Sequence, residues 1–168
     1  MTTTLYAQPY DISAQGFYFA SAEEYEQNVS ALRNAYGDPV EEFEIQFIDG
    51  EAIDCELARA IGINQANFAQ YLHGVDTWEA WEKQTLIIAI GECGYNFEPN
   101  LDPSEFDVDL YEVDSLRDLA EQFVDEGLFG EVPEAFQHYI DYDAIARDLA
   151  ADYSEITIAG EKYVCACR

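Results

Sequence analysis

The sequence has few basic residues. Seven Lys and Arg stand against 35 Asp and Glu, which gives the 168-residue chain a formal net charge of −28. Small domains usually carry a net charge of about 2–8 in magnitude. A surface this acidic repels nucleic acid and anionic membranes, so we expect neither as a partner. The natural partner is a basic surface, and DNA- and RNA-binding clefts are the widest class of such surfaces.

The chain also lacks the sequence motifs of enzymes and metal sites. There is no G-x-G-x-x-G, G-x-x-x-x-G-K-[ST], G-x-S-x-G or H-E-x-x-H motif. The two histidines, His73 and His138, are far apart, and the four cysteines lie at scattered spacings, so a closed zinc site is not expected. The D-x-D-x-D-G loop of calcium sites is missing as well. We therefore expect no catalytic residue, no metal and no cofactor, and a protein that is not an enzyme.

Long hydrophobic runs are absent too. The longest, LIIAIG at residues 86–91, is far shorter than the roughly 20 residues that span a bilayer. The opening MTTTLYAQ has neither the basic nor the apolar segment of a signal peptide, so we expect a cytoplasmic location. The chain nevertheless contains 12 Tyr, 10 Phe and 2 Trp. Acidic disordered segments lack such residues, which indicates a folded protein.

Hydrophobic periodicity predicts an α+β fold. In residues 40–48, Phe43, Ile45 and Phe47 alternate with acidic and polar residues, which predicts a half-buried strand. A capping box at Ser21 and apolar residues at helical spacing predict a helix that continues to Tyr36. Helices are also predicted throughout residues 52–94, one of them capped by a pair formed by Asp76 and Glu79.

The last third of the chain shows the same mixture. A strand is predicted over residues 106–113, and Ser115 and Asp141 are each placed to cap a helix. A short helix is predicted from Pro133 to Ile140, and Asp143 is placed to pair with Arg147. The final residues predict a β-hairpin that turns at residues 159–160.

Turn residues divide the chain into three parts. Asp49-Gly50 forms a turn signal, and the stretch GYNFEPNLDPSE at residues 94–105 has no apolar periodicity. We therefore predict three small subdomains: a β/α subdomain over residues 1–50, a helical subdomain over residues 51–98, and an α/β subdomain over residues 99–168 that ends in the hairpin.

The spacing of the carboxylates resembles the spacing of phosphates in DNA. Same-face neighbours on a strand lie about 6–7 Å apart, and i, i+4 neighbours on a helix lie about 6 Å apart. Successive phosphates of a duplex have comparable separations. The acids predicted to form a DNA-like surface are Glu42, Glu44, Glu105, Asp107, Asp109, Glu112, Asp114, Asp118, Glu121, Asp125, Glu126, Asp148 and Asp152.

Composition alone leaves other interpretations open. A salt-adapted protein shows the same excess of acids, and an acidic immunity protein or antitoxin neutralises a basic nuclease in a similar way. A DNA mimic directed at a CRISPR effector or a nucleoid protein is a further alternative. Because residues 1–96 and residues 97–161 are both strongly acidic, the charge belongs to the whole folded body and not to an appended tail.

The stretch GEVPEAFQHYIDYDAIARDLAADY, residues 130–153, resembles the ArdA antirestriction proteins of plasmids and conjugative elements. The matching features are Gly130, Val132, Pro133, Phe136, Tyr139, the Ile140-Asp141-Tyr142 triplet and the Arg147-Asp148-Leu149 triplet. The length, the charge, the preceding acidic helix and the final hairpin fit the same family. At the N-terminus the chain departs from it, since Tyr6, Gly16 and Phe17 stand where the family commonly has a tyrosine strand, a glycine loop and a tryptophan.

This resemblance implies a fold and a function. ArdA proteins are DNA mimics that occupy the DNA-binding groove of type I restriction–modification enzymes, so the expected partner is the methyltransferase core of such an enzyme. The implied fold is an elongated chain of three small subdomains that forms a curved acidic rod and dimerises. The segment implied to help form the dimer or to carry antirestriction activity contains Pro133, Phe136, Tyr139, Asp141, Tyr142 and Ile145, with the four apolar and aromatic residues from Phe136 on as core or interface.

Overall fold

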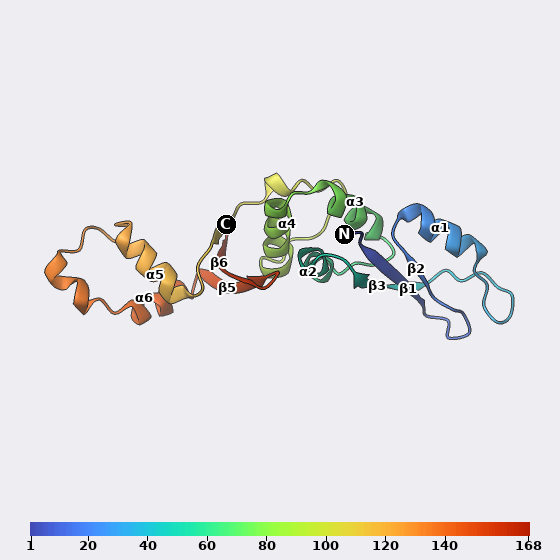
Figure 1. Cartoon of the computed structure of the whole chain (residues 1–168), viewed down its shortest axis with the longest axis horizontal. Helices are drawn as coiled ribbons and strands as arrows, with labels where there is room; N and C mark the ends of the chain where they lie inside the picture. Colours follow the sequence, from blue (N-terminus) through green and yellow to red (C-terminus); the bar gives the residue numbers. More distant parts are fainter. The chain divides into compact units, whose positions relative to one another are not determined.

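The computed structural model describes all residues, 1–168, and the chain divides into two compact units, Met1–Pro103 and Ser104–Arg168. Each unit contains α-helices and one three-stranded antiparallel sheet (Figure 1). The protein therefore has the mixed α+β fold that the hydrophobic patterns predicted. None of its helices is both long and apolar enough to cross a membrane.

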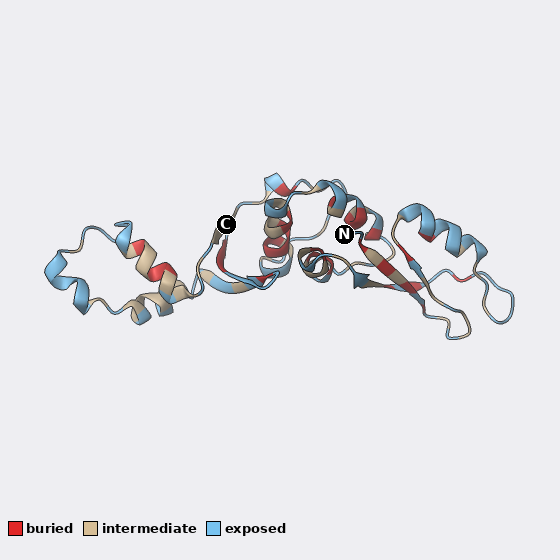
Figure 2. Cartoon of the chain, viewed as in Figure 1, coloured by how far each residue is buried: buried red, intermediate tan, exposed pale blue.

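The first sheet has the strand order β2-β1-β3. Its strands are β1 (Thr4–Pro9), β2 (Phe17–Phe19) and β3 (Phe43–Asp49). The predicted alternation is confirmed in β3, where Phe43 and Ile45 are buried and Glu44 is exposed. Buried and exposed residues alternate along the strands of this sheet (Figure 2). Its inward face packs against helices through aromatic rings, and Tyr18 and Ile48 on the other face are exposed.

Helix α1 (Ala22–Ala31) begins where the capping box predicted. The Ser21 hydroxyl accepts a hydrogen bond from the N–H of Glu24 at 3.1 Å. The prediction that this helix continues to Tyr36 is wrong. The side-chain oxygen of Asn34 accepts hydrogen bonds from the N–H groups of Tyr36 and Asp38, each at 2.9 Å, and so offers the backbone a turn in place of the helix.

Three further helices complete the first unit: α2 (Ala52–Ile61), α3 (Phe68–Thr77) and α4 (Ala80–Leu86), the last continuing into the π-helical turn η1 (Ile87–Glu92). Phe68 of α3 joins them to the sheet, since its ring centroid lies 5.2 Å from that of Phe19 and 4.6 Å from that of Tyr25. Residues 1–50 and 51–98 thus share an aromatic core within one unit, and their division into separate subdomains stays a prediction.

A buried ion pair lies inside this helical region. Lys83 Nζ of α4 is 2.7 Å from Asp54 Oδ1 of α2, and the two side chains are 9% and 3% exposed. The Tyr71 hydroxyl donates to the carbonyl oxygen of Asp54 at 2.6 Å. Burial, with the Asp54 charge as a smaller cause, raises the pKa of Tyr71, which keeps this donor protonated.

The second unit is built around a smaller core. Its sheet has the order β4-β6-β5, and its elements are β4 (Val108–Tyr111), α5 (Leu116–Asp125), η3 (Glu134–Tyr139), α6 (Tyr142–Leu149), β5 (Tyr153–Ile158) and β6 (Glu161–Cys167). The short turn η2 (Pro103–Glu105) precedes it. Leu119, Phe123 and Val164 are buried together. The predicted hairpin is confirmed, and Ala159 and Gly160 both have positive φ, as a tight hairpin turn requires.

The segment before α6 differs from its prediction. The expected helix from Pro133 to Ile140 is the 3₁₀ turn η3, in which no residue is buried. Phe136 and Tyr139 are 61% and 82% exposed, so within this chain they are not core residues. The prediction for Asp141 is confirmed, since its carboxylate accepts the N–H of Ala144 at 3.0 Å and caps α6.

The buried ion pair gives a stability prediction. We expect Lys83→Met to lower the free energy of unfolding by about 3–5 kcal/mol, because it leaves the Asp54 carboxylate buried without a partner. The double variant Asp54→Leu/Lys83→Met should be more stable than Lys83→Met. The measurement is urea unfolding of the full chain followed by far-UV circular dichroism. Arg59→Met, which removes the same charge from an exposed position of α2, is the control. An equal loss in the Lys83 and Arg59 variants would contradict the expectation.

Candidate functional site: an acidic surface

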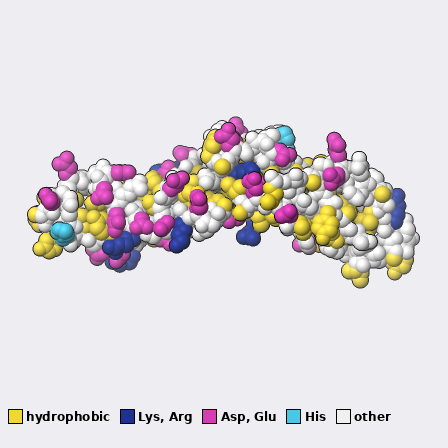
Figure 3. Space-filling model, viewed as in Figure 1, with side chains coloured by type: hydrophobic (Ala, Val, Ile, Leu, Met, Phe, Trp, Pro, Cys, Tyr) yellow, Lys and Arg dark blue, Asp and Glu magenta, His cyan; other side chains and the backbone are white.

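The carboxylates lie almost entirely on the surface. Asp54 is the one buried acid among the 35, and every other Asp and Glu is exposed or half-buried. Figure 3 shows carboxylates distributed over the visible face of both units, with few Lys and Arg between them. Each unit therefore presents many more negative than positive side chains to solvent.

The second unit carries most of the acids predicted to form the DNA-like surface. Asp109, Asp118 and Glu121 are half-buried. The others are exposed: Glu105, Asp107, Glu112, Asp114, Asp125, Glu126, Asp148 and Asp152. Asp107 lies just before β4, outside the shorter strand that replaces the one predicted over residues 106–113. Asp152 lies beyond the end of α6, which carries Asp148.

Helix α5 shows how the fold holds its acids apart from the core. Leu119, Ala120 and Phe123 are buried on one side of the helix, and Asp118, Glu121 and Asp125 lie outside that stripe. Two hydrogen bonds cap the start of the helix. The N–H of Asp118 donates to the Ser115 hydroxyl at 3.2 Å, and the N–H of Leu116 donates to Glu155 Oε1 of β5 at 2.9 Å. The Glu155 carboxylate therefore caps a helix, a role that the sequence pattern did not indicate.

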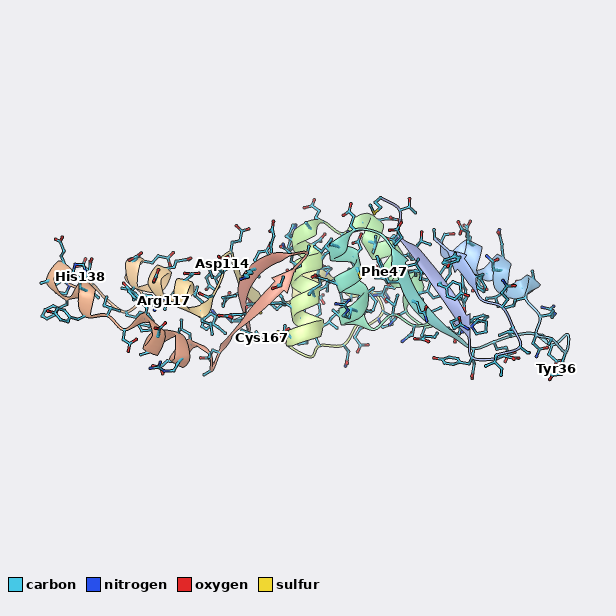
Figure 4. The ribbon with its side chains drawn as sticks, turned by 60° about the horizontal axis from the view of Figure 1, so that its bottom comes forward. Tyr36, Phe47, Asp114, Arg117, His138 and Cys167 are labelled. Atoms are coloured by element: carbon cyan, nitrogen blue, oxygen red, sulfur yellow. The ribbon has the colours of Figure 1, made fainter.

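Arginines occupy part of this acidic surface. Arg117, labelled in Figure 4, lies on α5. Its guanidinium is 2.7 Å from Asp143 of α6 and 3.5 Å from Glu121, and it lies 5.9 Å from the centre of the Tyr142 ring. The hydrogen bond with Asp143 is the largest cause of the raised pKa of Arg117. The predicted ion pair between Asp143 and Arg147 is wrong. Asp143 pairs with Arg117 because α6 packs on α5.

Arg168 likewise balances the charge of a carboxylate, here one on the sheet of the second unit. Arg168 pairs with Asp109 of β4, and this hydrogen bond raises the pKa of Arg168. Asp109, Glu121 and Asp143 are consequently balanced in part, whereas the structure shows no ion pair for the exposed acids Asp107, Glu112, Asp114 and Asp125.

The first unit contributes a second group of acids. Glu42 and Glu44, the two predicted members, are both exposed, one just before β3 and one on it. Glu23 and Glu26 of α1 are also exposed and were not predicted. The signal for them was present in the sequence AEEYEQ, where Tyr25 is the one buried residue of the helix and acids surround it.

Apolar side chains are exposed in the segment that carried the family resemblance. Phe136 and Tyr139 project from η3, Pro133 is exposed, and Tyr142 and Ile145 of α6 are half-buried. A pocket of about 300 Å³ lies beside them. It is lined by Val124, Asp125, Gly127, Gly130, Glu131, Val132, Gln137 and Tyr142.

The structure shows no group of three or more His, Cys, Asp or Glu residues placed to hold a metal ion. Both histidines are exposed: His73 lies on α3, and His138 lies on η3. The carboxylates are numerous and lie on many different elements of each unit.

Exposed carboxylates in large excess on small α+β units define an acidic α+β protein. A family model described as "Antirestriction protein (ArdA)" matches residues 12–163, and the chain belongs to this family. The resemblance seen in residues 130–153 is thereby confirmed. Membership makes the protein an antirestriction protein, directed against restriction–modification enzymes, and its family is one of inhibitors and not a known enzyme family. No curated protein sequence matches the chain.

The contacts of Arg117 give a second stability prediction. We expect Arg117→Gln to lower the melting temperature more than Arg147→Gln, because Arg147 is an exposed arginine of α6 for which the structure shows no ion pair. Both variants remove one positive charge from the same unit. The difference should shrink as NaCl rises from 20 to 500 mM, since salt screens exposed ion pairs. Thermal melts followed by circular dichroism measure it, and equal melting temperatures at 20 mM NaCl would contradict it.

Proposed function

We propose that the protein is a DNA mimic that occupies the DNA-binding groove of a type I restriction–modification enzyme and so blocks DNA binding. The observation that carries this proposal is the large excess of exposed carboxylates on a folded scaffold, in a chain of the antirestriction family. The methyltransferase core, which must bind duplex DNA, is the partner that this surface fits best.

The scaffold supplies what an acidic tail does not. Carboxylates on α5 are held about 5–6 Å from their helical neighbours, a separation close to that of successive phosphates. The helix is itself held by its caps and by the buried Leu119 and Phe123. A groove lined with Lys and Arg to bind phosphates therefore meets negative charges at separations close to those of phosphates. Because the helix is already ordered, the protein loses little conformational entropy on binding.

The proposal also includes the quaternary arrangement. A homodimer whose subdomains follow one another along a curved rod would extend the acidic surface over the length of a DNA site. The exposed Phe136 and Tyr139 support a contact between copies through η3 and α6, because a chain with a net charge of −28 associates with itself most readily where apolar groups are exposed. The expected place of action is the cytoplasm, where restriction enzymes meet incoming DNA.

Competition with DNA tests the proposal directly. A purified type I methyltransferase is saturated with fluorescently labelled duplex, and the protein is added while anisotropy is recorded. Stoichiometric release of the duplex is the expected result. A parallel assay with the complete restriction enzyme records cleavage. If the duplex stays bound in the first assay and cleavage is still inhibited in the second, the protein acts elsewhere on the enzyme and DNA mimicry is wrong. If neither binding nor cleavage changes, another target of the acidic surface must be sought.

Charge removal tests the same mechanism at the level of residues. We expect Asp107→Asn, Glu112→Gln, Asp114→Asn and Asp125→Asn, combined in one variant, to weaken displacement of the duplex about fivefold or more at low salt, since each exposed ion pair contributes roughly 0.2–1 kcal/mol. The salt dependence should become flatter. The matched control exchanges Asp for Glu and Glu for Asp at the same four positions, which keeps the charge and should keep the salt dependence. Full inhibition by the neutralised variant would overturn the mimicry.

A further inference from the structure

A cluster of apolar side chains is exposed at one end of the first sheet. We call it the paired-loop tip and define it as residues 10–15, between β1 and β2, and residues 33–42, between α1 and β3. Ile12 is 101% exposed, Tyr36 is 83% exposed and Tyr10 is 64% exposed. Figure 4 shows Tyr36 at the outer end of its loop. Single exposed apolar residues are ordinary, but several on adjoining loops mark an interaction site.

The two loops are fastened to each other by side chains. Asp11 Oδ2 accepts a hydrogen bond from Asn34 Nδ2 at 3.0 Å, and Ser13 Oγ accepts one from the N–H of Ala35 at 3.3 Å. Asp11 Oδ1 accepts from both the N–H and the hydroxyl of Ser13, at 2.9 and 2.7 Å. The hydrogen bonds from Ser13 and Asn34 lower the pKa of Asp11, so its carboxylate stays ionised. Ile12 is the residue between Asp11 and Ser13 in this turn, and its side chain is exposed.

The second loop is ordered in the same way. The side chain of Asn34 closes a turn over Tyr36 and Asp38, and a β-bridge joins Arg33 to Pro39. The N–H of Tyr10 donates to the carbonyl of Glu42 at 3.1 Å. Because the backbone of both loops is held before binding, presenting Ile12 and Tyr36 to a partner costs little backbone entropy.

The charges around the tip define what it fits. A pocket of about 250 Å³ has apolar walls from Tyr10, Pro39 and Val40 and acidic walls from Asp11, Glu41 and Glu42. Asp38 is exposed beside it. Arg33 is the one basic residue of the tip, and its guanidinium donates to the carbonyl oxygens of Ser30 and Leu32. The four acids therefore leave the tip negative. Such a pocket suits the aliphatic stem and charged end of a Lys or Arg side chain. An anionic membrane or a second copy of the same tip would bring like charges together, so both are poor occupants.

We propose that the paired-loop tip docks on the restriction–modification enzyme itself, against an apolar surface that carries Lys or Arg, and not in the place of a phosphate. This inference rests on the proposed function and adds that the protein binds its target by two kinds of contact. The acidic surface supplies attraction that salt weakens, and Ile12 and Tyr36 supply apolar contacts that depend little on salt.

The test measures duplex displacement from the purified methyltransferase at 50 and 300 mM NaCl. We expect Ile12→Ser/Tyr36→Ser to weaken displacement about tenfold at both salt concentrations, with an unchanged slope of log affinity against log salt. Ile12→Lys should also weaken it, since it places a positive charge opposite a basic partner. Ile48→Ser, which removes an exposed apolar side chain from β3 outside the tip, is the control and should leave displacement unchanged.

The outcomes separate this inference from the proposed function. Tip variants that displace DNA within twofold of the unmodified protein overturn the inference, while the four-acid variant still reports on mimicry in the same assay. A tip variant that changes only the oligomeric state in sedimentation shows a contact between copies and also overturns it. If the unmodified protein displaces no duplex, proposed function and inference fail together. Circular dichroism and melting temperature confirm that each variant is folded, as expected for side chains this exposed.

Discussion

Mutual repulsion among carboxylates is the constraint that the rest of this structure satisfies. A net charge of −28 on 168 residues destabilises any compact state, so the apolar cores must offset it. Each unit does this with aromatic rings in contact, such as Tyr25 with Phe68 in the first and Phe123 with Tyr153 in the second. The acids stay at the surface because burying an unpaired charge costs its solvation free energy, and the one buried carboxylate, Asp54, is paired with Lys83.

This arrangement separates charge from apolar contact. Most exposed carboxylates have no basic partner, because only a few bases are available and Arg117 and Arg168 already bind acids of their own unit. Several exposed apolar residues lie in two loop regions, the paired-loop tip and the segment around η3, while others, such as Tyr18 and Trp81, lie outside both. At physiological salt the Debye length is about 8 Å, so distributed charge acts over a short range. Apolar contacts retain their strength under those conditions.

Local sequence signals predicted the regular elements well. The caps at Ser21, Ser115 and Asp141 lie where they were expected, because each needs a backbone N–H only three residues away. The alternation in β3 also held. The prediction for the start of α4 was wrong. The capping box there is formed by Glu79 and Glu82, whereas the sequence analysis expected Asp76 and Glu79. Asp and Glu are so frequent in this chain that several pairs satisfy the same spacing.

Longer-range features were beyond the reach of sequence patterns. The end of α1 depends on Asn34, which binds the backbone of its own loop and also Asp11, 23 positions earlier. The segment from Pro133 to Ile140 has helical spacing, but no element of its unit covers it, so its apolar residues stay exposed. Whether an apolar residue is core or surface depends on what packs against it, which spacing along the chain does not specify.

The sequence by itself determined the sign and size of the charge, the α+β class and the family, because composition, periodicity and motif are properties of residues close together in the chain. Only the tertiary structure decided which acids are balanced and which apolar groups are exposed. Asp143 meets Arg117, Asp109 meets Arg168, and Asp11 meets Asn34 because packing brings distant segments together. These encounters divide a uniformly acidic chain into paired, capping and unpaired carboxylates.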